Sequence, residues 1–287
     1  MSSVLKMKQG TYIGISPHSS LHIGSVRTFL YVYSFARKNH MPMYLRCDDT
    51  NKDRGESSNL EHLIHQLEDF GVEFDYNELH YWNSSIIYQS RNTDIYKQFL
   101  SKLVEMDVTS ELGGLISLDI TKVLGLLGNI RISMADLIKH STTFNLSACG
   151  YKFIPLFSLT KDRFLFHIPC IVDEDLMGIS VSIRGEDKIP LVCIHDTLRI
   201  LLGLRPVQYL HLPILLDRIT QKRLRGEQYF IDKILTRFDK NSVLNYLLKS
   251  GYRTEKLSFK NLHEFMRDFD HKLIKKSSNY FDENEIK

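Results

Sequence analysis

The first hundred residues alternate between short apolar runs and longer amphipathic segments. Residues 11–15 and 43–47 are predicted strands, and residues 24–39 between them carry apolar side chains at helical spacing. Two further amphipathic segments, 60–70 and 94–106, are predicted helices. Strands and helices that alternate at this spacing indicate βαβ units. The sequence therefore predicts an α/β fold built on a parallel sheet.

The turn from the first strand into the first helix carries the tripeptide His22-Ile23-Gly24. Backbone N–H groups are unpaired at a helix N-terminus and the helix dipole is positive there, so this turn suits a phosphate. Gly24 lets the backbone approach a ligand closely, and His22 can donate a hydrogen bond to a phosphate oxygen. The alternative is a turn glycine beside a partly buried histidine. The motifs further along the chain favour the phosphate site.

The rest of the chain is predicted to hold an insertion, a second α/β part and a helical tail. Residues 107–150 contain more Gly, Ser and Thr, have no clean period, and form the predicted insertion. Later segments with a clear pattern are strands at 164–172 and 179–183, and helices at 194–202, 233–238, 242–250 and 261–269. The predicted domain boundaries are 1–106 and 151–231 for the two halves of the α/β domain, 107–150 for the insertion, and 232–287 for a small helical domain.

Composition excludes few classes of protein. The chain has 287 residues, 43% hydrophobic and 25% charged, as is typical of a globular protein with a sizeable core. A formal charge of +3 neither demands nor excludes a nucleic-acid partner. Without a signal-peptide pattern or a run of ~18 apolar residues, a cytoplasmic protein with no membrane partner is expected. The four cysteines form no Cys-x-x-Cys pair, so no zinc or other metal site is expected, and buried, reduced thiols are.

Two adjacent acids, Asp48 and Asp49, follow the second predicted strand within the segment Arg46–Asn51. Ligands of open α/β sheets bind beyond the carboxyl ends of the strands. One interpretation is a loop with an Asx turn or a helix N-cap. The other is an anchor for an ammonium group, with one acid serving as its counter-ion.

An ordered series of motifs resembles the glutamyl-tRNA synthetases, which are class I aminoacyl-tRNA synthetases. The segment Arg46–Asn51 resembles the acidic motif of this family in its glutaminyl-branch form, and the resemblance covers nearly the whole chain in order. The other matching motifs are Ser16-Pro17, Leu21-His22-Ile23-Gly24, Arg27-Thr28, Phe35-Ala36-Arg37, Tyr88-Gln89-Ser90 with Arg91 and Tyr96, Val172-Asp173-Glu174-Asp175 with Met177-Gly178, Arg184-Gly185-Glu186-Asp187, His211-Leu212-Pro213, Leu244-Asn245-Tyr246-Leu247, Gly251-Tyr252 and Phe281-Asp282.

The resemblance implies a Rossmann-type nucleotide-binding catalytic domain, an inserted acceptor-end-like subdomain and a C-terminal stem-contact-like domain. It implies activation of an amino acid by ATP with Mg²⁺, followed by transfer of the acyl group to an acceptor such as a tRNA end. The residues that it assigns to ATP are Ser16, His22, Gly24, Ser25, Glu186, Asp187 and Leu212. The amino-acid site comprises Tyr12, Ser16, Asp48, Phe166, Cys170 and Arg184, and the catalytic residues are His22, Lys222, Arg223 and Arg225.

The amino-acid pocket departs from the family pattern. Tyr12 stands where the family has an Arg, and Phe166 and Cys170 stand where it usually has Tyr and Asn, in a predicted strand. A buried carboxylate without paired donors costs several kcal/mol. One remaining Arg, Arg184, does not easily serve two carboxylates, so glutamate is not the expected substrate. The alternatives are an alignment that slips by one residue at Phe166, or compensation by His18 or His167.

The catalytic loop and the length of the chain also depart from the family. The run Gln221-Lys222-Arg223-Leu224-Arg225-Gly226 replaces the family's Lys-Leu-Ser-Lys-Arg. Its cations either act on pyrophosphate in a changed geometry or form a solvated basic loop with reduced activity. The sequence ends where the family's anticodon-binding domain begins. Three hypotheses remain: a repurposed adenylate-forming ligase, a catalytically silent paralogue that binds a nucleotide or an amino acid, and half of a split synthetase with a separate protein partner.

Overall fold

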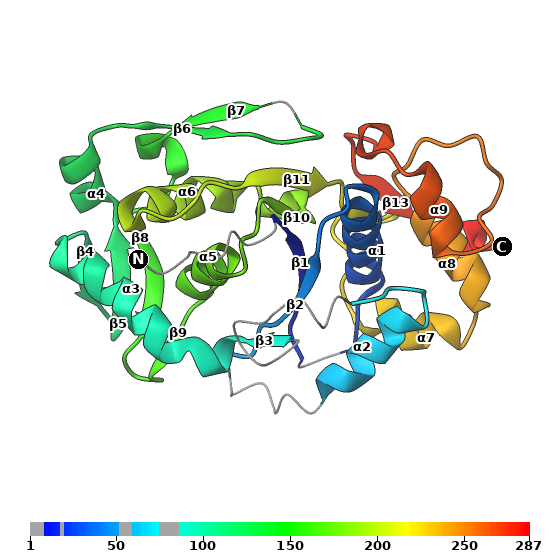
Figure 1. Cartoon of the computed structure of the whole chain (residues 1–287), viewed down its shortest axis with the longest axis horizontal. Helices are drawn as coiled ribbons and strands as arrows, with labels where there is room; N and C mark the ends of the chain where they lie inside the picture. The colour runs from blue at the N-terminus through cyan, green and yellow to red at the C-terminus, as the bar shows by residue number, and fades with distance from the viewer. Residues whose placement is uncertain (1–8, 18–19, 52–58, 75–85, 140) are drawn as a thin grey trace.

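The centre of the computed structural model is a parallel sheet (Figure 1). The described residues are 9–17, 20–51, 59–74, 86–139 and 141–287. A parallel bridge between Gly10 and Ile179 joins a three-stranded and a two-stranded part, giving the order β3-β2-β1-β10-β11. The predicted α/β class with a Rossmann-type core is confirmed. The strands are β1 (Thr11–Ile15), β2 (Met43–Cys47), β3 (Ile86–Tyr88), β10 (Val181–Gly185) and β11 (Gln208–Leu212).

The helix α1 (Ile23–Lys38) lies between this sheet and the C-terminal helices (Figure 1). Most of its side chains from Val26 to Ala36 are buried because it is covered on both sides. The ring of His22 caps its first turn, and Arg37 and Lys38 in its last turn complement the helix dipole. The other two predicted N-terminal helices are α2 (Leu60–Glu68) and α3 (Thr93–Glu105).

An antiparallel sheet of order β4-β5-β8-β9 begins within the predicted insertion and extends past residue 150. Its core of apolar side chains is shared with α3 and with two later helices, α5 and α6. The predicted domain boundaries stay predictions. The elements of this region are β4 (Thr109–Leu112), β5 (Leu115–Asp119), α4 (Ile120–Leu127), β6 (Arg131–Met134), β7 (Thr142–Asn145), η4 (Leu146–Cys149), β8 (Phe153–Ser158) and β9 (Arg163–Phe164).

The predicted strand at 164–172 is wrong. Only β9 ends there, and α5 (His167–Leu176) follows as a helix that is buried along most of its length. A short, continuous apolar run fits a buried strand and a buried helix equally well, and Pro169 is tolerated because it lies in the first helical turn. Phe166 and Cys170 are therefore the N-cap residue and a residue of this helix. The next helix, α6 (Pro190–Leu202), begins at Pro190, earlier than predicted.

The tail is helical as predicted except near its end. α7 (Ile231–Leu235), α8 (Lys240–Lys249) and α9 (Leu262–Asp268) match the three predicted helices. However, β13 (Asn279–Phe281) pairs in parallel with β12 (Leu215–Asp217), the strand that precedes the predicted catalytic loop. A strand of three residues is too short for its alternating pattern to be recognised in the sequence. Its pairing is determined only by the edge of β12.

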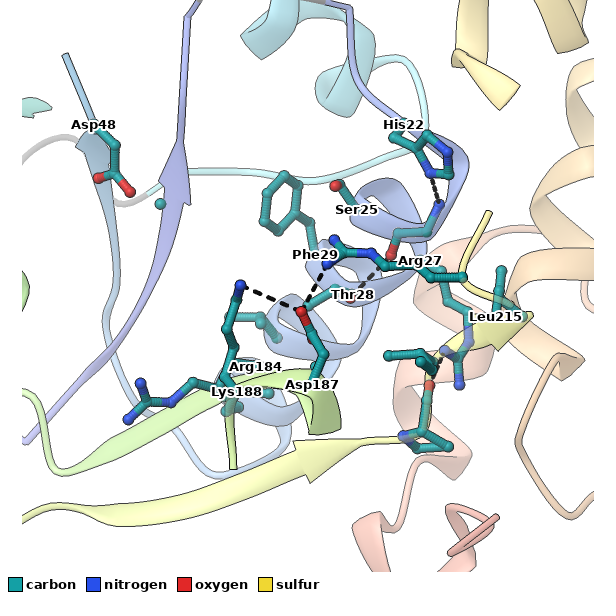
Figure 2. Close-up of a pocket in the computed structure, with 18 of the residues that line it drawn as sticks. His22, Ser25, Arg27, Thr28, Phe29, Asp48, Arg184, Asp187, Lys188 and Leu215 are labelled. Atoms are coloured by element: carbon teal, nitrogen blue, oxygen red, sulfur yellow. Dashed lines mark hydrogen bonds and ion pairs between the residues drawn. The ribbon is translucent and has the colours of Figure 1, made fainter. Parts of the chain in front are cut away.

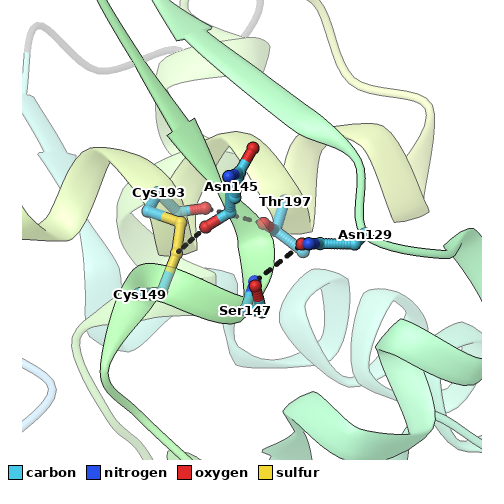
Figure 3. The surroundings of a disulfide bond; sticks show 6 residues. All are labelled: Asn129, Asn145, Ser147, Cys149, Cys193 and Thr197. Atoms are coloured by element: carbon cyan, nitrogen blue, oxygen red, sulfur yellow. Dashed lines mark hydrogen bonds between the residues drawn. A yellow bond between two sulfur atoms is a disulfide. The ribbon is translucent and has the colours of Figure 1, made fainter.

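The expectation of four reduced cysteines is wrong for two of them. Cys149 at the end of η4 and Cys193 on α6 form a disulfide, with Cα atoms 6.2 Å apart (Figure 3). Cys47 and Cys170 are free and buried, as expected. The two bonded residues are 44 positions apart, and only the packing of η4 on α6 brings them together.

Candidate active site

A cavity of about 400 Å³ lies beside the first turns of α1, at the carboxyl ends of strands of the parallel sheet (Figure 2). Open α/β sheets bind ligands at this edge. The predicted site residues that line the cavity are Tyr12, His22, Gly24, Ser25, Asp48, Phe166, Cys170, Arg184, Asp187 and Arg223. The predicted residues that do not line it are Ser16, Glu186, Leu212, Lys222 and Arg225.

His22 presents one hydrogen-bond donor where the cavity meets the first turn of α1. Its Nδ1 accepts from the backbone N–H of Gly24 at 3.2 Å, so the ring proton is on Nε2 (Figure 2). Nε2 is buried and has no partner among the described residues. Burial, and then the nearby Arg223, lower the pKa of His22, so its ring is neutral at pH 7. A neutral imidazole with a free Nε2–H is suited to donate to a phosphate oxygen.

The expectation that free backbone N–H groups form a phosphate cradle at this turn is wrong. The N–H of Gly24 bonds to the His22 ring, and those of Ser25 and Val26 bond to the His22 carbonyl oxygen at 2.8 and 3.0 Å. The tight first turn therefore uses these donors itself. A phosphate here would meet the His22 Nε2–H, the Ser25 side chain and the positive end of α1.

The two acids after β2 have separate roles. Asp49 accepts hydrogen bonds from the backbone N–H and the hydroxyl of Ser90, at 2.8 and 2.6 Å, so it ties the end of β2 to the segment after β3. Asp48 lines the cavity and is held by Arg46, whose Nε and Nη2 donate to its two oxygens at 2.6 and 3.1 Å. The Asp48 side chain remains 26% exposed, so its carboxylate is accessible to a ligand cation.

A buried carboxylate, Glu174, lies behind Tyr12, which lines the cavity. The Tyr12 hydroxyl donates to it at 2.7 Å, Ser182 donates at 2.8 Å, and Arg199 forms an ion pair with it. Burial alone would raise the pKa of Glu174, but Arg199 and then Arg184 outweigh burial, so the carboxylate is charged. In the sequence, Glu174 stands out only as part of a family motif, because nothing there places it beside Tyr12.

Arg184 is another residue that lines the cavity (Figure 2). Its Nη1 lies 3.3 Å from His195 Nδ1, and its guanidinium lies over the ring of Tyr209. Its Nε and Nη2 are buried and have no partner among the described residues. Burial alone would lower the pKa of Arg184, but the Glu174 carboxylate outweighs burial and raises it. The cavity therefore contains a permanent cation with two donors left for a ligand.

The predicted compensation by a histidine is not supported at His167. Its Nδ1 lies 3.3 Å from His195 Nε2, and burial lowers its pKa to about 4. His167 is thus neutral at pH 7 and does not supply a second cation. His18, the other candidate, lies outside the described residues.

Of the three predicted cations in the loop after β12, only Arg223 lines the cavity. A bridge between Leu216 and Arg223 folds the loop back on β12, and Asp217 accepts from Thr220 within the turn. Lys222 and Arg225 are exposed. Arg223 Nη1 lies 2.7 Å from Asp187 Oδ2, which also pairs with Lys188. The loop therefore presents one cation to the cavity.

Three further predicted site residues lie outside the cavity. Glu186 accepts from Lys139 at 2.6 Å, from the Ile214 N–H at 3.1 Å and from Ser278, so its carboxylate connects parts of the fold. Leu212 is buried in the core, and Ser16 is exposed beyond β1. None of these three residues lines the cavity, so their predicted contacts with a ligand stay predictions.

Comparison with known proteins shows what the chain resembles. Residues 11–109 match the family described as tRNA synthetases class I (E and Q), catalytic domain. Over this part, the chain is similar to class I tRNA synthetases. Glutamate–tRNA ligase 2 of Helicobacter pylori (strain Shi470) is 26% identical, over 93% of this chain and 65% of its own length. Glutamate–tRNA ligase of Chloroherpeton thalassium is 25% identical, over 83% of this chain and 56% of its own length. The chain thus spans less than two thirds of the length of these relatives.

Solved structures share the fold. The crystal structure of glutamate–tRNA synthetase from Elizabethkingia anophelis has a TM-score of 0.78 and 18% identity, and covers 97% of this chain and 69% of its own. The glutamate tRNA ligase from Elizabethkingia meningosepticum, solved in complex with its amino acid, has a TM-score of 0.79 and 18% identity, over 97% of this chain and 68% of its own. At this identity the likeness shows the synthetase fold alone.

Sequence motifs gave no role to Arg27, which lines the cavity from α1. Arg27 is 1% exposed. Its Nη1 donates to the Pro213 carbonyl at 2.6 Å and its Nε to the Ser250 carbonyl at 2.7 Å. It therefore ties α1 to the segment that leads into β12 and to the end of α8. A charged residue within a run of otherwise buried helix positions was the available signal.

Within the described ranges, no three His, Cys, Asp or Glu side chains are grouped so that they could hold a metal ion. Over the same ranges, no helix combines the length and apolar character needed to cross a membrane. The expectation of no zinc stays a prediction.

Proposed function

We propose that this chain is an ATP-dependent ligase that activates an amino acid as its adenylate. The observation that carries the proposal is that one cavity is lined both by His22 and Arg223, suited to phosphates, and by Asp48 and Arg184, suited to an amino acid. In the reaction, a carboxylate oxygen of the amino acid attacks the α-phosphorus of ATP. The bond from that phosphorus to the bridging oxygen breaks, and pyrophosphate leaves. Positioning and charge stabilisation account for catalysis of such a step.

Each group has a role in this proposal that follows from its free atoms. Asp48 binds the α-ammonium, and Arg184 binds a carboxylate through Nε and Nη2. His22 donates from Nε2. Arg223 breaks its ion pair with Asp187 and binds the phosphates that become pyrophosphate. Mg²⁺ would arrive with the nucleotide and be held mainly by phosphates and water, as is usual for this ion.

We further propose that the amino acid is not glutamate. Arg46 is occupied by Asp48, the Tyr12 hydroxyl by Glu174, and His167 is neutral, so among these neighbours Arg184 is the cation that keeps donors for a ligand. Glutamate brings two carboxylates, and leaving one buried and unpaired costs several kcal/mol. An amino acid with an uncharged side chain avoids this cost.

The acyl group then passes to an acceptor. The names of the relatives favour a tRNA, as expected for a tRNA ligase. A modified tRNA base, a small molecule and a carrier are the other acceptors consistent with the same adenylate. Each differs only in the nucleophile that attacks the acyl carbon and releases AMP.

ATP–pyrophosphate exchange, run with each common amino acid separately, tests the activation step. Exchange with one uncharged amino acid is expected, with no signal for glutamate. An Arg184→Lys variant should weaken the response, since an ammonium does not reproduce a two-donor edge. Strong exchange with glutamate would overturn the proposed specificity. Silence with every amino acid, both with and without bulk tRNA, would overturn the proposed activity.

A second candidate is a silent synthetase paralogue that binds a nucleotide or an amino acid. The observation in its favour is the loop: Lys222 and Arg225 are exposed, and Arg223 is paired with Asp187. Such a protein would bind ATP in calorimetry and give no exchange. A separate protein partner, as in a split synthetase, would restore exchange when added.

A further inference from the structure

His195 is a buried group that the proposed reaction does not use. It lies on α6 with 0% of its surface exposed. Its Nδ1 is 3.3 Å from Arg184 Nη1, and its Nε2 is 3.3 Å from His167 Nδ1. A guanidinium only donates, so Nδ1 of His195 must accept. The ring proton of His195 is therefore on Nε2 and is donated to His167 Nδ1, which puts the proton of His167 on Nε2.

This chain of two histidines fixes one end of the Arg184 guanidinium. Tyr209 covers a face of the same guanidinium, with its ring centroid 4.7 Å from the guanidinium carbon. The Tyr209 hydroxyl in turn donates to Asp196, so the ring is held in place. With Nη1 engaged and one face covered, the Nε and Nη2 edge is what remains for a ligand in the cavity that Arg184 lines.

We propose that His195, supported by His167, is the positioning residue that aims the Nε–Nη2 edge of Arg184 at a carboxylate in the amino-acid end of the cavity. The inference rests on the proposed function, because it takes Arg184 as the group that binds the substrate carboxylate. Without an acceptor at Nδ1, one N–H of Arg184 would be buried and unsatisfied. The guanidinium would then turn toward the charged Glu174, and its edge would no longer face the ligand.

The first measurement needs no ligand, no activity and no variant. Long-range ¹H–¹⁵N correlation spectra of the unliganded protein report the tautomer of each histidine. We expect both His195 and His167 to carry their proton on Nε2. A proton on Nδ1 of His195 would overturn the proposal, because that nitrogen could not accept from Arg184.

The second measurement titrates acetate, as a minimal carboxylate, while following the Nε–H resonance of Arg184. The resonance is identified by its loss in Arg184→Lys, and chloride at equal ionic strength serves as the control. His195→Leu has no acceptor for Arg184, and we expect acetate to bind this variant about tenfold more weakly. This is the effect of losing one hydrogen bond that orients the guanidinium. His195→Asn keeps an oxygen near Nδ1 and should restore binding. Equal acetate affinity in wild type and His195→Leu would contradict the proposal.

These readouts separate the inference from the proposed function. If exchange is silent but the tautomers and the acetate series follow expectation, His195 positions Arg184 in a binding protein. If exchange occurs but His195→Leu leaves the KM for the amino acid unchanged, the ligase stands and the positioning role is wrong.

Discussion

Arg223 Nη1 lies 2.7 Å from Asp187 Oδ2, so the loop after β12 is tied to the end of β10 across the cavity. Both residues line the cavity, whereas Lys222 and Arg225 of the same loop do not. The Arg223 side chain is 57% exposed, and an exposed ion pair of this kind contributes ~0–1 kcal/mol to stability. Its importance is therefore positional: it holds the loop cation beside the cavity, from where Arg223 can move to a phosphate in the proposed reaction.

Replacing Arg223 with Ala should reduce ATP–pyrophosphate exchange by about 100-fold, since removing one charge-stabilising group commonly costs this much in rate. Its folding stability should change by no more than ~1 kcal/mol. Exchange kinetics and urea denaturation measure the two effects separately.

The matched controls are Lys222→Ala and Arg225→Ala, which remove equal charge from exposed positions of the same loop. Each should lower exchange by less than about threefold, because exposed charges are largely screened. If Lys222→Ala is the more damaging change, the loop acts in a different register from the one described.

Arg27 should be a larger determinant of stability than its place on a helix suggests. Replacing it with Met removes the donor that Arg27 gives to the Pro213 carbonyl and one of the donors to the Ser250 carbonyl, which keeps the Tyr31 hydroxyl at 3.2 Å. The change should cost about 2–4 kcal/mol of the free energy of unfolding. Lys38→Met, an exposed cation on the same helix, should stay within about 0.5 kcal/mol.

Gly251 provides an independent check on the same contact. A Cβ at this position would collide with Arg27 Nη2, and the backbone has φ +85°, which disfavours other residues. Gly251→Ala should therefore be destabilising as well. Stabilities of Arg27→Met and Gly251→Ala close to wild type in urea would rule out this contact as a tie between α1 and α8.

The sequence was sufficient for elements whose pattern is local. β1 and β2 lie at the predicted residues, and α1 differs by one residue at each end. In all three, the apolar side chains follow a clear pattern along the sequence. The strand predicted at 164–172 failed because a buried helix and a buried strand share a continuous apolar run. β13 could not be predicted, since its pairing depends on the edge of β12, more than 60 residues earlier.

The site divides in the same way. Family resemblance led to His22, Asp48 and Arg184, which do line one cavity. Their partners could not be predicted, because they come from other elements: Glu174 behind Tyr12, His195 beside Arg184, and Asp187 opposite Arg223. These contacts decide which atoms remain free for a ligand, and they exist only in three dimensions.

The stability of the protein should respond to acid through two opposing groups. Burial lowers the pKa of His167 to about 4 from an ordinary 6.5, so the unfolded chain binds more protons between these values. The stability due to neutral His167 is therefore lost as pH falls from 6.5 toward 4. Burial raises the pKa of Asp173 from 3.8 to about 6, so its contribution instead grows as pH falls through 6.

Each shift corresponds to about 3 kcal/mol, so the contributions of these two groups should nearly cancel between pH 6 and 4. His167→Asn removes only the histidine contribution. Its stability relative to wild type should therefore rise by up to about 3 kcal/mol as pH falls from 6.5 to 4. Urea midpoints at several pH values give this difference. A difference that does not change with pH would show that His167 titrates normally.

The disulfide between Cys149 and Cys193 should stabilise the chain by closing a loop of 44 residues in the unfolded state. The chain-entropy relation gives about 4 kcal/mol for such a loop, an upper value because strain reduces it. Reduction with dithiothreitol, or the Cys193→Ser variant, should therefore lower the urea midpoint.

Cys47→Ser is the matched control, because Cys47 is free. The urea midpoint of this variant should fall on reduction as much as that of the wild type. Thiol titration of the unfolded, unreduced protein should find two reactive thiols, because the other two are bonded. Four thiols in the freshly isolated protein, with a midpoint indifferent to reductant, would mean that η4 and α6 are joined by packing alone.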